Sequence, residues 1–293
     1  MKRFALFLLL GCALSSTSLA NDEARIARLS AAHQALAQRM IRFIEHADTK
    51  YFGRIEALNG SLPTERLTQA TDYSDFDVLV TRGAVIEKAG RMVSVSKKAS
   101  PGRGDGELVW GRFYSLDFHP KTPLVGMLHA TVVLQFFVDG SAGVGGWLDV
   151  LPGTRIEADL QELKTLTDAH FAAHDKDPSL YRRLVCKGTH DTIAEFRRQP
   201  SCSGVSFYGP PVYRDDTGKS YAFVEELFEQ FVDTYLDIVE RRADDTFTDA
   251  DLAAQDKMRK TWLIDQLFSD PFSSKIVPFE VWSFANVPPV IKF

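Results

Sequence analysis

The chain lacks most of the features that mark the best-known protein classes. Acidic residues outnumber Lys and Arg, the net charge is −5, and no basic stripe is present, so nothing favours a nucleic-acid partner. No glycine-rich nucleotide loop, G-x-S-x-G turn or Cys-x-x-Cys pair occurs. No apolar run after residue 20 approaches the roughly 20 residues that a membrane-spanning helix needs.

The N-terminus has the parts of an export signal. Met1–Arg3 is cationic, Phe4–Leu14 is largely apolar, and a small-x-Ala ending follows at Ala20. We expect cleavage after Ala20 and a periplasmic or secreted mature protein. Leu9–Cys12 also resembles a lipobox, in which case Cys12 would be lipidated and would anchor the chain at a membrane. A buried N-terminal helix is a further alternative.

Cysteine is scarce, with three residues in the whole chain. Cleavage after Ala20 would leave Cys186 and Cys202. An oxidising compartment allows a disulfide between them, and two small buried thiols are the alternative. The sequence leaves both possibilities open.

Hydrophobic periodicity predicts strands in the middle of the chain and helices before and after them. Predicted helices cover residues 22–46, 156–174, 180–198, 221–242 and 248–267, and predicted strands cover residues 77–81, 84–87, 92–96, 113–118, 129–138, 145–151 and 205–208. We expect the tail, residues 276–293, to be extended. No internal repeat or long linker is present, so residues 21–293 are predicted to form one α+β domain, an antiparallel sheet covered by helices.

Several motifs occur in an order that is more specific than any one of them. They are Arg82–Glu87, Ser115–Pro123, Leu128–Phe137, Gly145–Pro152, Tyr235–Arg242 and Pro288–Lys292. The central three resemble S-x-x-x-H-P-R-N-P, H-A-N-x-R-x-F and G-G-G-x-D-L-T-P of the oxygen-dependent coproporphyrinogen III oxidases. The order and spacing agree from about residue 80 to the C-terminus.

The resemblance implies a fold, a reaction and a partner. The family folds as a large flat antiparallel sheet flanked by helices on both faces, and its members usually form homodimers. It converts two propionates of a porphyrinogen, a tetrapyrrole, to vinyl groups with molecular oxygen. No cofactor is required in some members, and a divalent metal has been proposed in others, so a metal is possible here.

Matched position by position, the resemblance assigns roles to individual residues. His129 is the expected acid or base, and Asp149 is the expected carboxylate that faces the pyrrole N–H groups. Ser115 is expected to form a hydrogen bond with the substrate, and Lys121 keeps a positive charge that can bind the substrate carboxylates. A satisfied core histidine and a buried, paired aspartate are the alternatives for His129 and Asp149.

Other matched positions are weaker candidates or departures from the family. Thr131, which replaces a family Asn, and Arg82 are further expected substrate contacts, and His119 and His129 are candidate metal ligands. The family Arg of the second motif is Val133 here, which cannot bind a carboxylate. Such losses keep open an alternative, a catalytically weakened exported protein that binds haem or a porphyrin.

A second alternative is a metal-binding protein that uses His170 and His174. These residues lie one helical turn apart, which is a spacing at which two imidazoles can share an ion. Asp175 and His190 could complete such a site. Two half-buried histidines that end a helix are the structural alternative.

Overall fold

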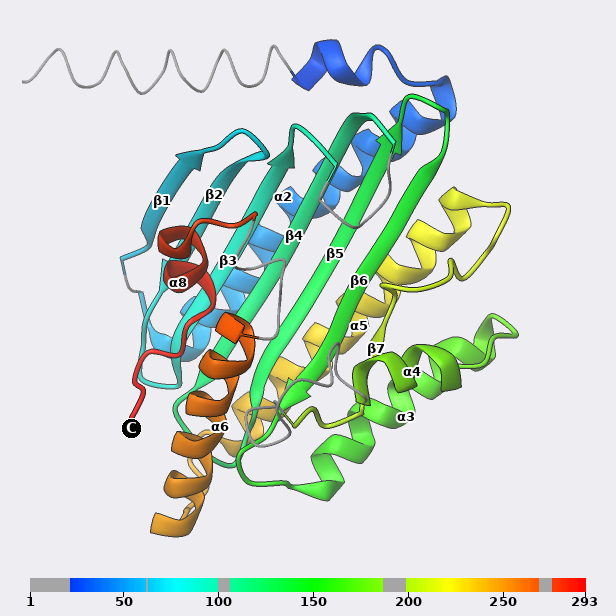
Figure 1. The fold of residues 1–293 in the computed structure, drawn as a ribbon. Helices are drawn as coiled ribbons and strands as arrows, with labels where there is room; N and C mark the ends of the chain where they lie inside the picture. Colours follow the sequence, from blue (N-terminus) through cyan, green and yellow to red (C-terminus); the bar gives the residue numbers. More distant parts are fainter. Residues whose placement is uncertain (1–21, 62, 100–105, 187–198, 269–275) are drawn as a thin grey trace, which may run out of the picture.

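The computed structural model describes residues 22–61, 63–99, 106–186, 199–268 and 276–293 (Figure 1). The predicted export signal, the lipobox residue Cys12 and His190 lie outside these ranges. Among the described helices, none is both long and apolar enough to cross a membrane.

One antiparallel sheet of seven strands forms the centre of the structure, and its spatial order equals its sequence order. The strands are β1 (Glu65–Ala70), β2 (Ser74–Thr81), β3 (Ile86–Ser96), β4 (Leu108–Pro120), β5 (Met127–Phe137), β6 (Ala142–Leu151) and β7 (Val205–Ser206). Antiparallel neighbours can be joined by short connections, as between β1 and β2, whereas the chain between β6 and β7 includes two of the described helices. The predicted strand-rich middle is therefore confirmed.

Helices cover both faces of the sheet, as predicted. Helices α2 (Ala31–Asn59) and α5 (Thr217–Arg242) lie behind it in Figure 1, and α6 (Asp249–Phe268) and α8 (Phe279–Asn286) lie in front. Helices α3 (Glu157–Ala173) and α4 (Ser179–Cys186) lie beside the β6–β7 edge. The α+β fold predicted from the sequence is confirmed.

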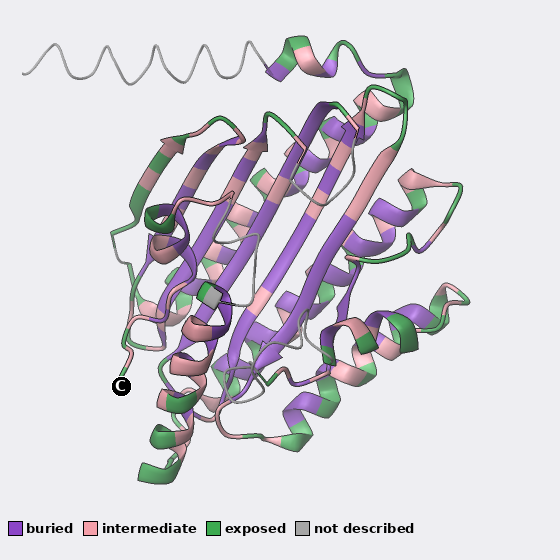
Figure 2. Cartoon of the chain, viewed as in Figure 1, coloured by how far each residue is buried: buried purple, intermediate pink, exposed green. Residues whose placement is uncertain are grey.

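The main core lies between the sheet and the helices α2 and α5. Alternate residues of the central strands, such as Leu116, Leu128 and Val132, are fully buried there and belong to one cluster with Phe228 and Phe231 of α5. Figure 2 shows this burial along the central strands, in contrast to the exposed β1. Because side chains alternate along a strand, the residues between these core positions project toward the opposite face.

The first predicted helix, residues 22–46, is largely confirmed but is interrupted and too short. Residues 22–26 are helical, the chain turns at residues 27–30, and the long helix begins after Ser30 and continues to Asn59. The Ser30 hydroxyl accepts a hydrogen bond from the His33 N–H. Asp22 caps no long helix, and its carboxylate instead accepts hydrogen bonds from Trp110 and Arg112 of β4. Ser30 is a favourable N-cap residue, so a new helix begins after it within the amphipathic stretch.

The tail was also predicted wrongly, because residues 279–286 form α8. This helix packs Val281 and Ala285 against Phe76 and Val78 of β2. The close approach depends on Gly90 of β3, where any side chain would collide with the carbonyl oxygen of Ala285. Tertiary packing therefore decides the structure of a segment that has little helical pattern of its own.

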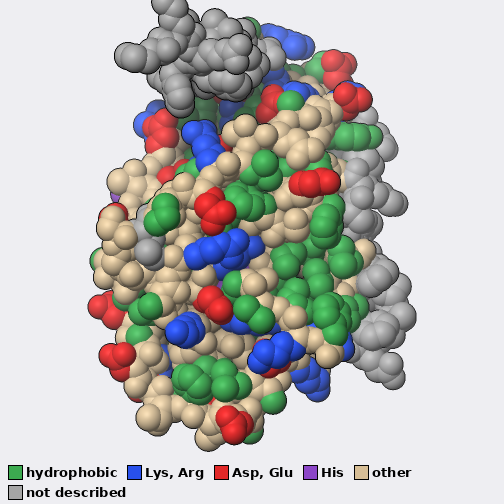
Figure 3. All heavy atoms as spheres, turned by 90° about the vertical axis from the view of Figure 1, so that its left-hand side faces the viewer, with side chains coloured by type: hydrophobic (Ala, Val, Ile, Leu, Met, Phe, Trp, Pro, Cys, Tyr) green, Lys and Arg blue, Asp and Glu red, His purple; other side chains and the backbone are tan. Residues whose placement is uncertain are grey.

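Strand β1 forms one exposed edge of the sheet and was not predicted. Its residues are mostly polar, and ion pairs link Arg66 to Asp77 and Arg82 to Glu65 along this edge. Figure 3 faces this side and shows acidic, basic and hydrophobic side chains interspersed over it. Charged side chains on an edge strand hinder pairing with another chain. The predicted homodimer stays a prediction.

Candidate active site

The sheet register brings four of the predicted site residues onto one face. Thr131 of β5 lies opposite Ser115 of β4 and Trp147 of β6, and His129 lies opposite Asp117 and Asp149. Directly opposed residues in antiparallel strands project from the same side of the sheet. These two rows therefore lie on the face away from the main core, toward α6 and α8 (Figure 1).

His129 and Asp117 form the hydrogen-bonded pair at the centre of these rows. The His129 Nδ1 atom lies 2.8 Å from Asp117 Oδ1, and the other carboxylate oxygen accepts a hydrogen bond from the Asn286 side-chain amide. The His129 side chain is 17% exposed, whereas the Asp117 side chain is 1% exposed. With its Nδ1–H donated to Asp117, the neutral imidazole presents Nε2 as a proton acceptor.

Two indole rings flank this imidazole. The ring of Trp262 from α6 lies 5.2 Å from the His129 ring, and the ring of Trp147 lies 6.4 Å from it, measured between centroids. Large flat apolar side chains suit a flat ring ligand, because aromatic groups gain from offset or edge contacts. The pair therefore lies among aromatic side chains, of which Trp262 is fully buried and Trp147 is 4% exposed.

Asn286 connects the pair to its surroundings. Its backbone oxygen lies 3.1 Å from His119 Nε2 and accepts the Trp262 indole N–H over 3.3 Å. Asn286, which lies two residues before the predicted motif Pro288–Lys292, therefore fixes both the carboxylate of Asp117 and the ring of Trp262. Hydrogen-bonded networks of this kind hold a reactive side chain in one orientation.

His119 is held as a neutral imidazole. Burial, together with the positive charges of Lys88 and Arg259, lowers its pKa well below the usual value. A cation is disfavoured in these surroundings, whether it is a proton or a metal ion. No group of three His, Cys, Asp or Glu ligands in the described part of the chain includes His119 or His129. The residues present at His119 therefore do not fit a divalent ion.

Lys88, which lies opposite His119 on β3, anchors the C-terminal segment. Its Nζ donates to the carbonyl oxygens of Val287 and Ser283 over 2.5 and 3.3 Å. Burial is the main cause that lowers the pKa of Lys88 to about 7. This lysine is committed to structural hydrogen bonds.

Asp149 is enclosed by residues 201–204. Its carboxylate accepts hydrogen bonds from the Ser201 hydroxyl and from the backbone N–H groups of Cys202, Ser203 and Gly204, over 2.6 to 3.1 Å. Burial raises the pKa of Asp149, and these hydrogen bonds oppose the rise. Its predicted role opposite pyrrole N–H groups stays a prediction, and that role requires residues 201–204 to move away.

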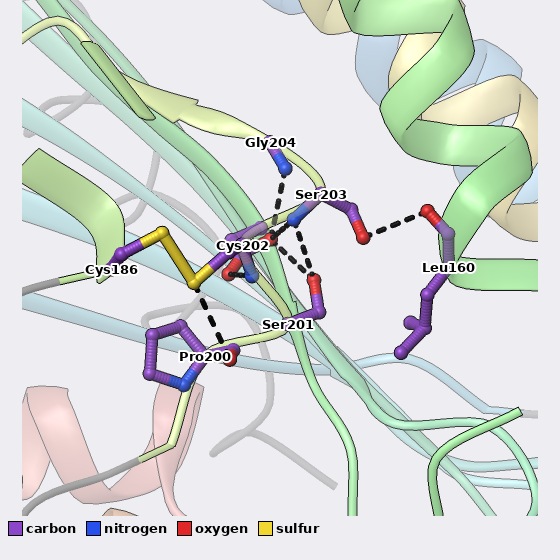
Figure 4. The surroundings of a disulfide bond; sticks show 8 residues. Leu160, Cys186, Pro200, Ser201, Cys202, Ser203 and Gly204 are labelled. Carbon is purple, nitrogen blue, oxygen red and sulfur yellow. Dashed lines mark hydrogen bonds between the residues drawn. A yellow bond between two sulfur atoms is a disulfide. The ribbon is translucent and has the colours of Figure 1, made fainter. Parts of the chain in front are cut away.

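A disulfide between Cys186 and Cys202 ties this segment to the end of α4 (Figure 4). The two Cα atoms lie 5.3 Å apart, within the range that a disulfide needs. Of the two alternatives that the sequence left open, the structure has the disulfide. The bond and the Asp149 carboxylate therefore hold the same short segment from two sides.

The remaining predicted substrate contacts differ in whether another residue already occupies their polar groups. Ser115 is buried, and its hydroxyl has no hydrogen-bond partner in the described residues. The Thr131 hydroxyl lies 2.9 Å from the Tyr208 hydroxyl. Lys121 is exposed at the end of β4, and Arg82 is bound to Glu65. Ser115 is thus the predicted contact with unused hydrogen-bonding capacity.

Asp117, Asn286, Trp147 and Trp262 were not selected from the sequence. Asp117 had a usable signal, because it is an acidic residue two positions from both Ser115 and His119 in the same strand. Spacing of two places all three side chains on one face. Asn286 and Trp262 carried no such signal, because their position depends on how α6 and α8 fold back over the sheet.

Comparison with protein families agrees with this arrangement. The family model described as coproporphyrinogen III oxidase matches residues 31–270, which include every strand of the sheet and both members of the His129–Asp117 pair. The chain belongs to the coproporphyrinogen III oxidase family.

Proposed function

We propose that this protein catalyses the oxygen-dependent oxidative decarboxylation of propionate side chains on a porphyrinogen, with His129 as the proton-transferring group. The His129–Asp117 pair carries the proposal. It combines a partly exposed imidazole, a buried carboxylate that orients it and a fixed tautomer, the parts that a general base requires. Membership of the coproporphyrinogen III oxidase family supports a substrate of this type.

The chemistry assigns His129 a defined step. Its Nε2 accepts a proton from a pyrrole N–H, which raises the electron density of the ring. A hydride equivalent then leaves the propionate carbon next to the ring, the bond to the carboxylate breaks, carbon dioxide departs and a vinyl group remains, and His129 returns its proton to the pyrrole nitrogen. Oxygen takes up the two electrons and two protons as hydrogen peroxide. For each vinyl group, one propionate, one oxygen molecule and one proton thus give one carbon dioxide and one hydrogen peroxide.

A second candidate function is tetrapyrrole binding without turnover. Cationic side chains near the described face are already committed: Lys88 donates to backbone carbonyls, and Arg259 pairs with Glu87. From Lys88 and Arg259, a substrate with four carboxylates would gain no bidentate arginine contact of the kind that binds such groups best. This observation favours a ligand held by aromatic contact with Trp147 and Trp262 and by the Ser115 hydroxyl. Because all three side chains are buried, the segments that cover them must move aside before a ligand can reach them.

We further propose that the protein acts outside the cytoplasm. The sequence of residues 1–20 supports this proposal, and so does the Cys186–Cys202 disulfide, because such bonds persist in oxidising compartments. The tetrapyrrole that reaches this protein would then be one that is present after export.

Turnover and binding can be measured on the same protein. Purified protein is incubated aerobically with coproporphyrinogen, and vinyl product is followed above the autoxidation blank. In parallel, the absorption band of coproporphyrin is titrated. The first function predicts turnover that His129→Gln abolishes, with binding retained. Binding without turnover, weakened by Ser115→Ala, would support the second function. Neither turnover nor saturable binding would reject both.

Asp48→Asn is a suitable control for these variants. Asp48 is a largely buried carboxylate on α2 that accepts from the Tyr114 hydroxyl and pairs with Arg91, on the opposite side of the sheet. Its loss tests the general effect of removing a buried charge without touching the candidate site. The folded Asp48→Asn protein should therefore keep the wild-type turnover.

A further inference from the structure

A histidine and carboxylate cluster lies between α3 and α5, away from the candidate active site. His170 and His174 come from the end of α3, and Glu226 comes from α5, and one ligand atom of each lies within 4.8 Å of the others. The rings of His170 and His174 lie 4.8 Å apart between centroids. From these contacts we propose that His170, His174 and Glu226 bind one divalent transition-metal ion, zinc being the best match.

The hydrogen bonds around the two histidines favour this assignment. His170 Nε2 lies 3.0 Å from the Phe223 carbonyl oxygen, to which it can only donate, so Nδ1 of the neutral ring is an acceptor. His174 Nδ1 lies 3.1 Å from the Tyr213 hydroxyl. When Nδ1 donates to that oxygen, Nε2 is the acceptor. Metal-binding histidines are oriented by such hydrogen bonds from the second ring nitrogen.

The distances are compatible with an ion after a small movement. His174 Nε2 lies 3.8 Å from Glu226 Oε2. Two ligands that each lie about 2 Å from a zinc ion are at most about 4 Å apart, so this pair already meets the limit. The Glu226 side chain is 50% exposed, so it has room to adjust. The Gln230 amide also hydrogen-bonds the His170 ring, and the ion would replace that contact.

The donor set decides the class of ion. Two imidazole nitrogens and one carboxylate oxygen form a set that zinc binds with a water in the fourth position, whereas magnesium and calcium prefer oxygen ligands throughout. Asp175, which the sequence suggested as a further ligand, is exposed and is not part of the cluster, and Glu226 takes its place. The spacing of His170 and His174 was informative, but only the packing of α3 on α5 brings in Glu226.

Zinc retention tests the site directly. The full chain is stripped with a chelator, dialysed against zinc chloride, desalted and assayed for zinc by atomic emission. The proposal predicts about one zinc ion per chain in the wild type. His174→Ala and Glu226→Gln should each lower the affinity by at least about tenfold, and Tyr213→Phe should lower it by about tenfold through the loss of an orienting hydrogen bond.

The chain offers a matched control in His46→Ala. His46 of α2 lies 3.8 Å from Glu229 of α5. This pair also joins a histidine to a glutamate of α5, but it is not part of the cluster that contains two imidazoles. This variant should bind zinc like the wild type. Cobalt bound to the wild type should give the intense visible absorption of a tetrahedral site, and His174→Ala should lose it.

Thermal unfolding gives a readout that does not depend on metal analysis. Because the ion would link α3 to α5 in the folded state alone, zinc should raise the unfolding temperature of the wild type and of His46→Ala but not of His174→Ala or Glu226→Gln. The proposal is overturned by a wild type that retains no zinc. It is equally overturned by retention that is the same in all variants, which would place the ion elsewhere.

Discussion

His129 owes its proposed role to its two neighbours more than to its position in a motif. Asp117 accepts the Nδ1 hydrogen bond, and Asn286 holds the second oxygen of that carboxylate. A lone histidine at the start of an apolar strand is often a satisfied core residue, but this one is 17% exposed and pairs with Asp117 through Nδ1, so Nε2 points away from that carboxylate. The buried carboxylate stabilises the positive charge that appears on the ring when Nε2 takes a proton.

The substitution Asp117→Asn removes the carboxylate charge beside His129 and changes which ring nitrogen of His129 carries the proton. The asparagine can still accept from Asn286, but it would present its amide N–H groups to His129 Nδ1 and favour the opposite ring tautomer. We expect kcat for vinyl formation to fall about 100-fold or more, which is the usual scale for general base catalysis, with KM little changed. Steady-state kinetics beside Asp48→Asn measures this. A wild-type kcat in Asp117→Asn would contradict the proposed role of the pair.

The lowered pKa of His119 makes the free energy of unfolding depend on pH. Its pKa in the folded protein lies well below the usual 6.5, so below about pH 6.5 the unfolded chain binds a proton that the folded chain does not. The unfolding free energy should therefore fall as the pH falls, by up to about 1.4 kcal/mol per pH unit, until the pKa of the folded state is reached.

His119→Gln isolates this contribution, because an amide can donate to the Asn286 carbonyl but does not titrate. Urea unfolding at about pH 7 and about pH 5.5 should show a larger loss of stability in the wild type than in the variant. Other groups with a lowered pKa, such as His170, contribute equally to both proteins. Equal losses in the two proteins would show that His119 is not the buried neutral imidazole described above.

At the scale of elements, the segment 201–204 shows how a short stretch of chain is fixed without regular structure. The Asp149 carboxylate takes three of its backbone N–H groups, and Gly204 allows a contact with Leu148 that any side chain would prevent. The Cys186–Cys202 disulfide holds the same segment from the side of α4. Together they cover one end of the face that carries His129.

Removing the disulfide should destabilise the protein rather than abolish its fold. The two cysteines are 16 positions apart in the sequence, and closing a loop of about that length stabilises a protein by about 3 kcal/mol. A Cys186→Ser, Cys202→Ser double variant should lose that amount in urea unfolding, and reduced wild type should match it. If oxidised wild type, reduced wild type and the variant all have the same stability, the disulfide does not form in solution.

At the scale of the whole molecule, the sequence predicted the sheet well and the enclosure of the site poorly. Runs such as Leu128–Phe137 alternate strongly, so the central strands were predicted correctly. The register of these strands, which the sequence did not predict, brings Ser115, His129 and Asp149 to one face. Periodicity reports which face of an element is buried, but not which other element covers it.

The unpredicted parts depend on long-range packing. Helix α8 forms because Val281 and Ala285 find an apolar surface on β2, and Asn286 and Trp262 reach the site only through that packing. The cover of Asp149 by residues 201–204 and the approach of Glu226 to His170 are likewise contacts between distant segments. Nothing in the local sequence of these residues specifies such partners, so a structure was needed to find them.

The products that the purified protein forms from coproporphyrinogen in air show whether His129 serves oxidative decarboxylation. We expect the wild type to release carbon dioxide and hydrogen peroxide in equal amounts, one of each for every vinyl group, and His129→Gln to release neither above the blank. Carbon dioxide at the level of the blank in the wild type, or the same release from His129→Gln, would contradict that role.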